Sequence, residues 1–133
     1  MREIKFRGFT KRGTCVYGYY QFDSGLNEHL IVSNGALIVV LSKNIGQYTG
    51  LKDKKGVEIY EGDILKVLNL ITRTYETGNV TFSGLGCWSI SIGHLRVPLF
   101  EFIDNSLSMI HSFDRIEVIG NIHANPELLT HNS

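Results

Sequence analysis

Proline and cysteine are both scarce in this sequence. Of its 133 residues only 2 are Pro and 2 are Cys. Cys15 and Cys87 lie far apart and belong to no CxxC pair, so they offer neither a disulfide framework nor a zinc-binding quartet. We expect both to be buried thiols that behave as small hydrophobic residues, as in most cytoplasmic proteins.

Long hydrophobic runs and net charge are missing as well. The longest apolar stretch, 29–41, is interrupted by Ser33-Asn34-Gly35 and falls short of the roughly 20 residues that cross a bilayer. Residues 1–7 alternate charged and apolar side chains, unlike a signal peptide. Because 13 basic residues balance 13 acidic ones, no overall field attracts polyanions or membranes. The sequence predicts a cytoplasmic protein without a membrane partner.

Recognisable catalytic and cofactor motifs are also lacking. The sequence contains no GxSxG, no HExxH, no GxGxxG and no GxxxxGK[ST]. Its five histidines stand at long, irregular intervals, at positions 29, 94, 111, 123 and 131. We therefore expect a protein that is not an enzyme and that holds neither a metal nor a cofactor.

The residues that are plentiful indicate β-structure. There are 14 Gly, which suits many tight turns, and apolar residues alternate with polar ones in several short segments. Asn34-Gly35 accepts the positive φ angles of a two-residue type I′ turn and predicts a hairpin of 29–32 and 36–40. A first hairpin is predicted from residues 4–7 and 14–22 around a turn at 10–13. The fold class we predict is mainly β, an antiparallel barrel or pseudo-barrel, in a single domain spanning residues 1–133.

Three other segments contain local signals of secondary structure. Residues 72–78 are polar and predict a loop before the strand that contains Val80. Residues 98–103 fit either a strand or a short helix that begins at Pro98, and we favour the helix. Asn125-Pro126, followed by an acid, predicts a terminal helical turn.

Two long blocks resemble a known family. They are residues 47–64 (QYTGLKDKKGVEIYEGDI) and residues 117–129 (EVIGNIHANPELL), and residues 1–7 (MREIKFR) match less closely. In this order and separation the blocks resemble the YopX family of bacteriophage and prophage proteins. The resemblance implies a β-rich pseudo-barrel with a short capping helix and some likeness to PRC-barrel domains. It also implies a small cytoplasmic protein of unassigned function that associates with itself, and it supplies no catalytic residue.

The first block contains the candidate contact residues. Lys52, Lys54 and Lys55 form a charged turn that could meet phosphates. We expect Tyr48 and Tyr60 to face solvent, where their rings could stack on bases. The alternative is a hairpin tip that its lysines keep soluble, which we favour.

The same block places three carboxylates within six residues. Glu58, Glu61 and Asp63 could form a divalent-metal or acid–base site. We favour a structural role, in which the Asp63 side chain accepts hydrogen bonds from backbone N–H groups of a turn.

The leading functional hypothesis is a phage-derived binding or assembly module in the host cytoplasm. Barrel loops and strand edges would recognise a host or phage protein, and an apolar edge such as residues 37–41 would mediate self-association. The alternative is a nucleic-acid-binding accessory protein that uses the lysine turn at residues 52–55.

Overall fold

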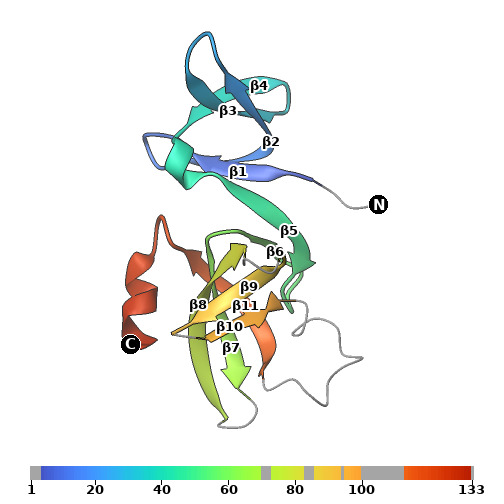
Figure 1. Ribbon diagram of the computed structural model, residues 1–133, viewed down its shortest axis with the longest axis vertical. Helices are drawn as coiled ribbons and strands as arrows, with labels where there is room; N and C mark the ends of the chain where they lie inside the picture. The colour runs from blue at the N-terminus through green and yellow to red at the C-terminus, as the bar shows by residue number, and fades with distance from the viewer. Residues whose placement is uncertain (1–3, 70–72, 83–85, 94, 100–112, 133) are drawn as a thin grey trace. The chain divides into compact units, whose positions relative to one another are not determined.

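In the computed structural model the strands form two antiparallel sheets (Figure 1). The structure describes residues 4–69, 73–82, 86–93, 95–99 and 113–132. The chain divides into two compact units, Met1–Gly50 and Leu51–Ser133, and each is described by itself.

The first unit is a sheet of short strands with the order β4-β3-β2-β1-β5. Its elements, in chain order, are β1 (Phe6–Phe9), β2 (Cys15–Asp23), β3 (Glu28–Ser33), β4 (Ala36–Val40), the 3-10 turn η1 (Ser42–Asn44) and β5 (Gly46–Lys52). The last residues of β5 enter the second unit, where the strand turns back into β6 (Glu58–Tyr60).

Both hairpins predicted for the first unit are present. The β1–β2 turn is closed by a hydrogen bond that the Gly13 N–H donates to the Thr10 carbonyl over 2.9 Å. Between β3 and β4, Asn34 and Gly35 adopt φ angles of 50° and 83° and follow directly on the paired residues Ser33 and Ala36. These positive φ angles confirm the prediction made from the Asn-Gly dipeptide.

The second unit is built around a five-stranded sheet with the order β10-β9-β8-β7-β11. Its strands are β7 (Asp63–Asn69), β8 (Thr74–Phe82), β9 (Trp88–Ile92), β10 (Leu95–Pro98) and β11 (Phe113–Asn121), and η4 (Pro126–Asn132) follows as a 3-10 helix. Its core is a cluster of buried branched aliphatic side chains, namely Ile59, Leu65, Val67, Val80, Ile90, Ile92, Leu99 and Ile116. Alternation along β7, β8 and β9 directs Leu65, Val67, Val80, Ile90 and Ile92 to one face of the sheet.

The mainly β prediction is confirmed, but the strands form two sheets that do not close into the predicted barrel or pseudo-barrel. Each sheet is open, with β4 at one end of the first sheet and with β10 and β11 at the ends of the second. Alternation along a strand reports which face is buried but not whether the first and last strands meet. Whether the chain is a single domain stays a prediction.

The helical turn predicted at Pro126 is confirmed as η4, but a helix that caps a barrel is not. The segment is a 3-10 helix that lies beside β8, where the Thr77 hydroxyl donates a hydrogen bond to the Leu128 carbonyl over 3.3 Å. It therefore packs beside one strand of an open sheet.

Two other sequence-based predictions are wrong in part. Residues 74–78 belong to strand β8 and pair with β7 from Asn69 to Leu65, because this polar stretch continues a long hairpin whose ladder satisfies its backbone. Pro98 ends strand β10 opposite Ser89, and the next residue, Leu99, has 3-10 helical conformation, so helical backbone starts one residue later than predicted. The remainder of that predicted helix, 100–103, lies outside the described residues.

No helix in the described part of the chain is both long enough and apolar enough to span a bilayer.

Candidate functional site

The lysine turn, residues 52–55, lies at the end of β5 and in the five-residue connection 53–57 between β5 and β6. The Asp53 N–H donates to the Val57 carbonyl over 2.8 Å, and the Gly56 N–H donates to the Asp53 carbonyl over 3.0 Å. Gly56 has a φ of 84°, the left-handed conformation that closes a loop of this type and that glycine adopts without strain.

The buried side chain of Asp53 holds this loop by hydrogen bonds. Its side chain is 7% exposed, and its Oδ1 accepts hydrogen bonds from the Lys55 N–H at 2.8 Å and the Val57 N–H at 2.9 Å. Its Oδ2 accepts a third from the Val118 N–H of β11 at 3.0 Å. One carboxylate therefore holds both the local turn and a strand that lies 65 residues further along the chain.

The lysines around Asp53 differ in their surroundings. Lys52, Lys54 and Lys55 are all exposed, but the Lys55 Nζ lies 2.8 Å from the Glu117 Oε2. This hydrogen bond and the charge of its partner raise the pKa of Lys55 and lower the pKa of Glu117. The Lys54 backbone N–H donates to the Ile116 carbonyl, so the loop is attached to β11 at several points.

Tyr48 and Tyr60 do not join the lysines at the surface. Tyr48 is 5% exposed and Tyr60 is 2% exposed, so the prediction that their rings face solvent is wrong. The Lys5 ammonium lies 5.2 Å from the centre of the Tyr48 ring, and the Tyr60 hydroxyl donates to the Glu58 carboxylate over 3.2 Å. Both rings are held by the fold and leave no open face for a base.

Asp63, one of the three carboxylates of the first block, has the structural role that we favoured. Asp63 is 1% exposed, and its Oδ2 accepts a hydrogen bond from the Tyr60 N–H at 2.8 Å. Between them Gly62, with a φ of 91°, donates its N–H to Val80 and accepts from the Ile122 N–H. Within the part of the chain that the structure describes, no three His, Cys, Asp or Glu side chains could together hold a metal ion.

In the second block, asparagine side chains stabilise a turn in a similar way. Asn121 Oδ1 accepts from the N–H groups of His123 and Ala124 at 3.0 and 2.9 Å, which turns the chain after β11. Gly120 leaves the space for Asn125, because a Cβ atom there would lie 2.6 Å from the Asn125 Oδ1.

The strand edge that the sequence suggested for self-association is exposed. β4 ends its sheet, and Leu37 and Val39 are 62% and 49% exposed. Leu37 lies opposite Val32, and Val32 lies opposite Tyr19, which is itself 69% exposed. Cross-strand partners project from the same face, so an apolar row crosses three strands and reaches the free edge.

Sequence reasoning missed Asp53 and Glu117. The spacing Asp53-x-x-Gly56 is typical of a turn in which an Asp side chain accepts a hydrogen bond from the backbone N–H two residues further on. This spacing could have identified Asp53 from the sequence. No sequence pattern indicates the hydrogen bond between Asp53 and Val118, because this contact depends on where β11 lies.

The comparisons agree with the two blocks. The family described as "YopX protein" matches residues 5–130, and no curated protein matches the chain. A solved structure, described as the crystal structure of protein EF1440 from Enterococcus faecalis, is 26% identical with a TM-score of 0.57, over 97% of this chain and 99% of that one. Since the family match spans nearly the whole chain, the protein belongs to the YopX family.

Proposed function

We propose that this protein is a phage- or prophage-derived binding or assembly module without enzymatic activity, that it acts in the host cytoplasm, and that it associates with itself through β4. The observation that carries the proposal is the exposed apolar edge strand. Membership of the YopX family, which we associate with phage genomes, supports the origin.

The chemistry of β4 favours pairing with a second copy. An edge strand presents unpaired N–H and C=O groups, and monomeric proteins protect such edges with charged residues, prolines or bulges. β4 has the sequence ALIVV and contains none of these protections. Two β4 strands related by a twofold axis can pair antiparallel, so that Leu37 and Val39 of both copies become neighbours across the new strand pair.

The absence of enzymatic activity is supported by the use of the acidic side chains. Asp53 and Asp63 accept hydrogen bonds from backbone N–H groups, and Glu117 pairs with Lys55. A carboxylate that holds a turn or an ion pair in this way is directed toward the fold rather than toward a substrate.

Light scattering across a range of protein concentrations tests the self-association. We expect the mass of the native protein to rise from one chain toward two, and Leu37→Lys to hold it at one chain. The matched control is Leu95→Lys, because Leu95 is 59% exposed on β10, an edge strand of the other sheet. A native protein that is monomeric throughout would refute the proposal, as would an equal effect of the two variants.

The alternative, a nucleic-acid-binding accessory protein, has weaker support. Lys52 and Lys54 remain available for phosphate contacts, but Lys55 is paired with Glu117 and both candidate tyrosines are buried. If this alternative holds, single- or double-stranded oligonucleotides bind at low salt, binding falls steeply as salt is added, and Lys54→Glu weakens it. Absence of binding at low salt eliminates it.

A further inference from the structure

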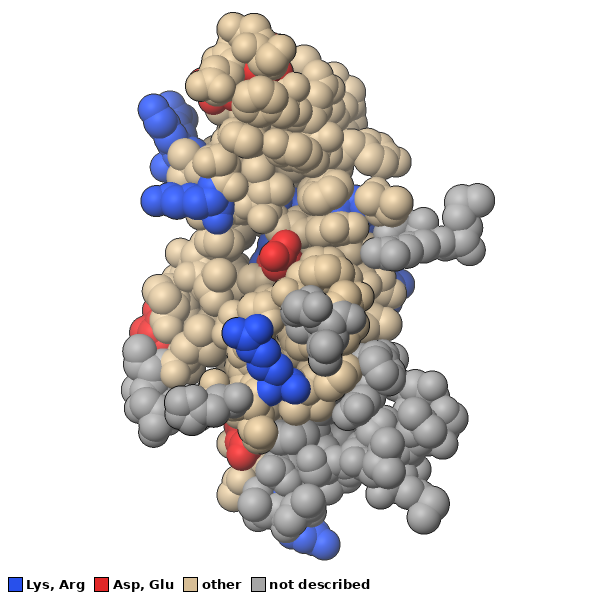
Figure 2. All heavy atoms as spheres, in the orientation of Figure 1, with Lys and Arg blue, Asp and Glu red and all other residues tan. Residues whose placement is uncertain are grey.

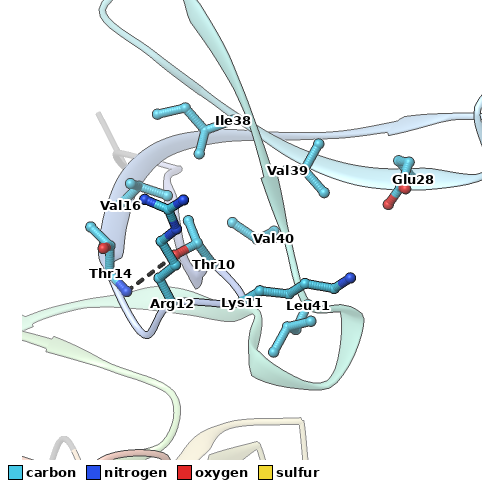
Figure 3. A pocket seen from close by; sticks show the side chains of 10 residues that line it. All are labelled: Thr10, Lys11, Arg12, Thr14, Val16, Glu28, Ile38, Val39, Val40 and Leu41. Atoms are coloured by element: carbon cyan, nitrogen blue, oxygen red, sulfur yellow. Dashed lines mark hydrogen bonds between the residues drawn. The ribbon is translucent and has the colours of Figure 1, made fainter.

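The first unit contains a pocket that no sequence motif indicated. It has a volume of about 560 Å³ and lies between β4 and the β1–β2 hairpin (Figure 3). This volume falls within the range of roughly 300–1,000 Å³ that is typical of small-molecule sites.

The walls of the pocket are aliphatic. Five of its ten lining residues are branched apolar side chains, namely Val16, Ile38, Val39, Val40 and Leu41. No aromatic residue lines the pocket, so it offers no ring on which a nucleobase or another planar ligand could stack. Such a lining suits a flexible hydrocarbon chain, which gains free energy from burial without requiring a partner ring.

Two basic side chains lie at the rim of the pocket. Lys11 and Arg12 are adjacent residues of the β1–β2 turn, both line the pocket, and both are exposed. The turn is fixed by the Thr14 N–H, which donates to the Thr10 Oγ1 over 3.2 Å. In Figure 3 the Arg12 side chain runs toward Val16, and the Lys11 side chain runs past Val40 and Leu41.

The charge at the rim is predominantly positive. Glu28 is the one acidic residue among the ten that line the pocket, and Figure 2 shows Lys and Arg side chains gathered on one side of this unit. Within the described residues the structure shows no ion pair for Lys11 or Arg12. An anionic group at the rim would be attracted by both positive charges, although the two side chains run in different directions in Figure 3.

We propose that this pocket binds an aliphatic anion, with the hydrocarbon chain between β4 and Val16 and with the carboxylate or phosphate head at Lys11 and Arg12. A free acyl carboxylate and an anionic lipid share this chemistry, and the experiment below distinguishes them. Leu37, the residue that tests the proposed self-association, does not line the pocket, whereas Ile38, Val39 and Val40 of the same strand do.

Amide chemical shifts of the full chain provide the test, with decanoate as the probe. We expect decanoate to shift the amides of residues 10–16 and 38–41. Each methylene buried is worth up to about a fourfold gain in affinity, so hexanoate should bind far more weakly. Decyltrimethylammonium has the same chain and the opposite charge, and it should not bind at this site. Equal binding of the cationic and anionic probes would overturn the proposal.

Two variants of equal charge change test the rim. Arg12→Glu should weaken decanoate binding by about three- to tenfold, as expected when exposed attraction becomes repulsion. Lys43→Glu is the control, because Lys43 is exposed on η1 of the same unit and does not line the pocket. If both variants weaken binding equally, the effect is one of net charge and the proposal fails.

Phosphatidylglycerol vesicles distinguish the two ligand sources. Binding to decanoate alone supports a free acyl carboxylate, and binding to vesicles that Arg12→Glu abolishes supports an anionic lipid. Binding to neither overturns the proposal. Leu37→Lys should leave decanoate binding unchanged, and Arg12→Glu should leave the oligomeric mass unchanged. Failure of the pocket proposal can therefore be distinguished from failure of the self-association proposal.

Discussion

Replacing Asp53 with Ala should destabilise the second unit more than an ordinary turn substitution does. The Asp53 carboxylate accepts two local hydrogen bonds within its loop and one from the Val118 N–H of β11. Losing the local bonds of such a side chain costs about 1 kcal/mol. Losing the bond from a partly buried N–H to a charged acceptor costs about 2 kcal/mol more. We therefore expect Asp53→Ala to lower the free energy of unfolding by about 3 kcal/mol.

Asn121→Ala is the matched control, because it removes a similar local arrangement from the same unit. Asn121 Oδ1 also accepts two backbone N–H groups within its own turn, but among the described residues its side chain has no hydrogen bond to a distant strand. We expect Asn121→Ala to cost about 1 kcal/mol. The difference between the two variants isolates the bond between the lysine turn and β11.

Trp88 provides the assay. It is the only tryptophan in the sequence, and it packs against the core of the second unit, so its fluorescence reports unfolding of that unit in a denaturant titration. Equal losses for Asp53→Ala and Asn121→Ala would refute the reasoning, because the long-range hydrogen bond would then contribute nothing. A difference of about 2 kcal/mol would support it.

Three further predictions concern the second unit. A Cβ atom at Gly78 would lie 2.2 Å from the backbone oxygen of Ser91, whereas at Gly120 the nearest atoms belong to side chains; Gly78→Ala should therefore lower the melting temperature more than Gly120→Ala, and the reverse order would contradict this. The pKa of Glu117 is lowered from 4.5, first by its hydrogen bond with Lys55 and then by the charge of Lys55. The stabilisation from this pair is thus complete above pH 4.5 and is lost as the pH falls through the lower, folded-state pKa. Glu117→Gln should remove that part of the acid dependence in denaturation curves recorded at several pH values, and an unchanged dependence would show that the pair contributes nothing. Lys55→Met should remove the same part of the acid dependence, because it breaks the same ion pair by removing the ammonium. A difference between the two variants would indicate that Glu117 or Lys55 has another charged partner.

Local features of the fold were readable from the sequence because their causes are local. Asn34-Gly35 specifies a hairpin through the φ angles that these two residues accept, and the structure has those angles. Asp63 was expected to accept backbone N–H groups, and it does so three residues from Tyr60. In both cases a few adjacent residues contain the whole physical reason for the structure.

Predictions about exposure and closure failed where the cause lies elsewhere in the chain. Tyr48 and Tyr60 flank a charged turn, and nothing in their neighbours indicates that both rings are buried. The barrel failed for the same reason, because closure depends on where the first and last strands of each sheet lie. The contacts of the second block with the lysine turn are likewise invisible in either block alone.

The sequence by itself therefore determined most of the strands, the tight turns, the family and the lack of recognisable catalytic motifs. These follow from backbone preferences, side-chain alternation and motif spacing, which are properties of short segments. Only the tertiary structure decided that the strands form two open sheets, that Asp53 holds β11, and that Lys11 and Arg12 stand over an aliphatic pocket. Each of these brings together residues far apart in the chain, and their meeting depends on the packing of the whole unit rather than on any local preference.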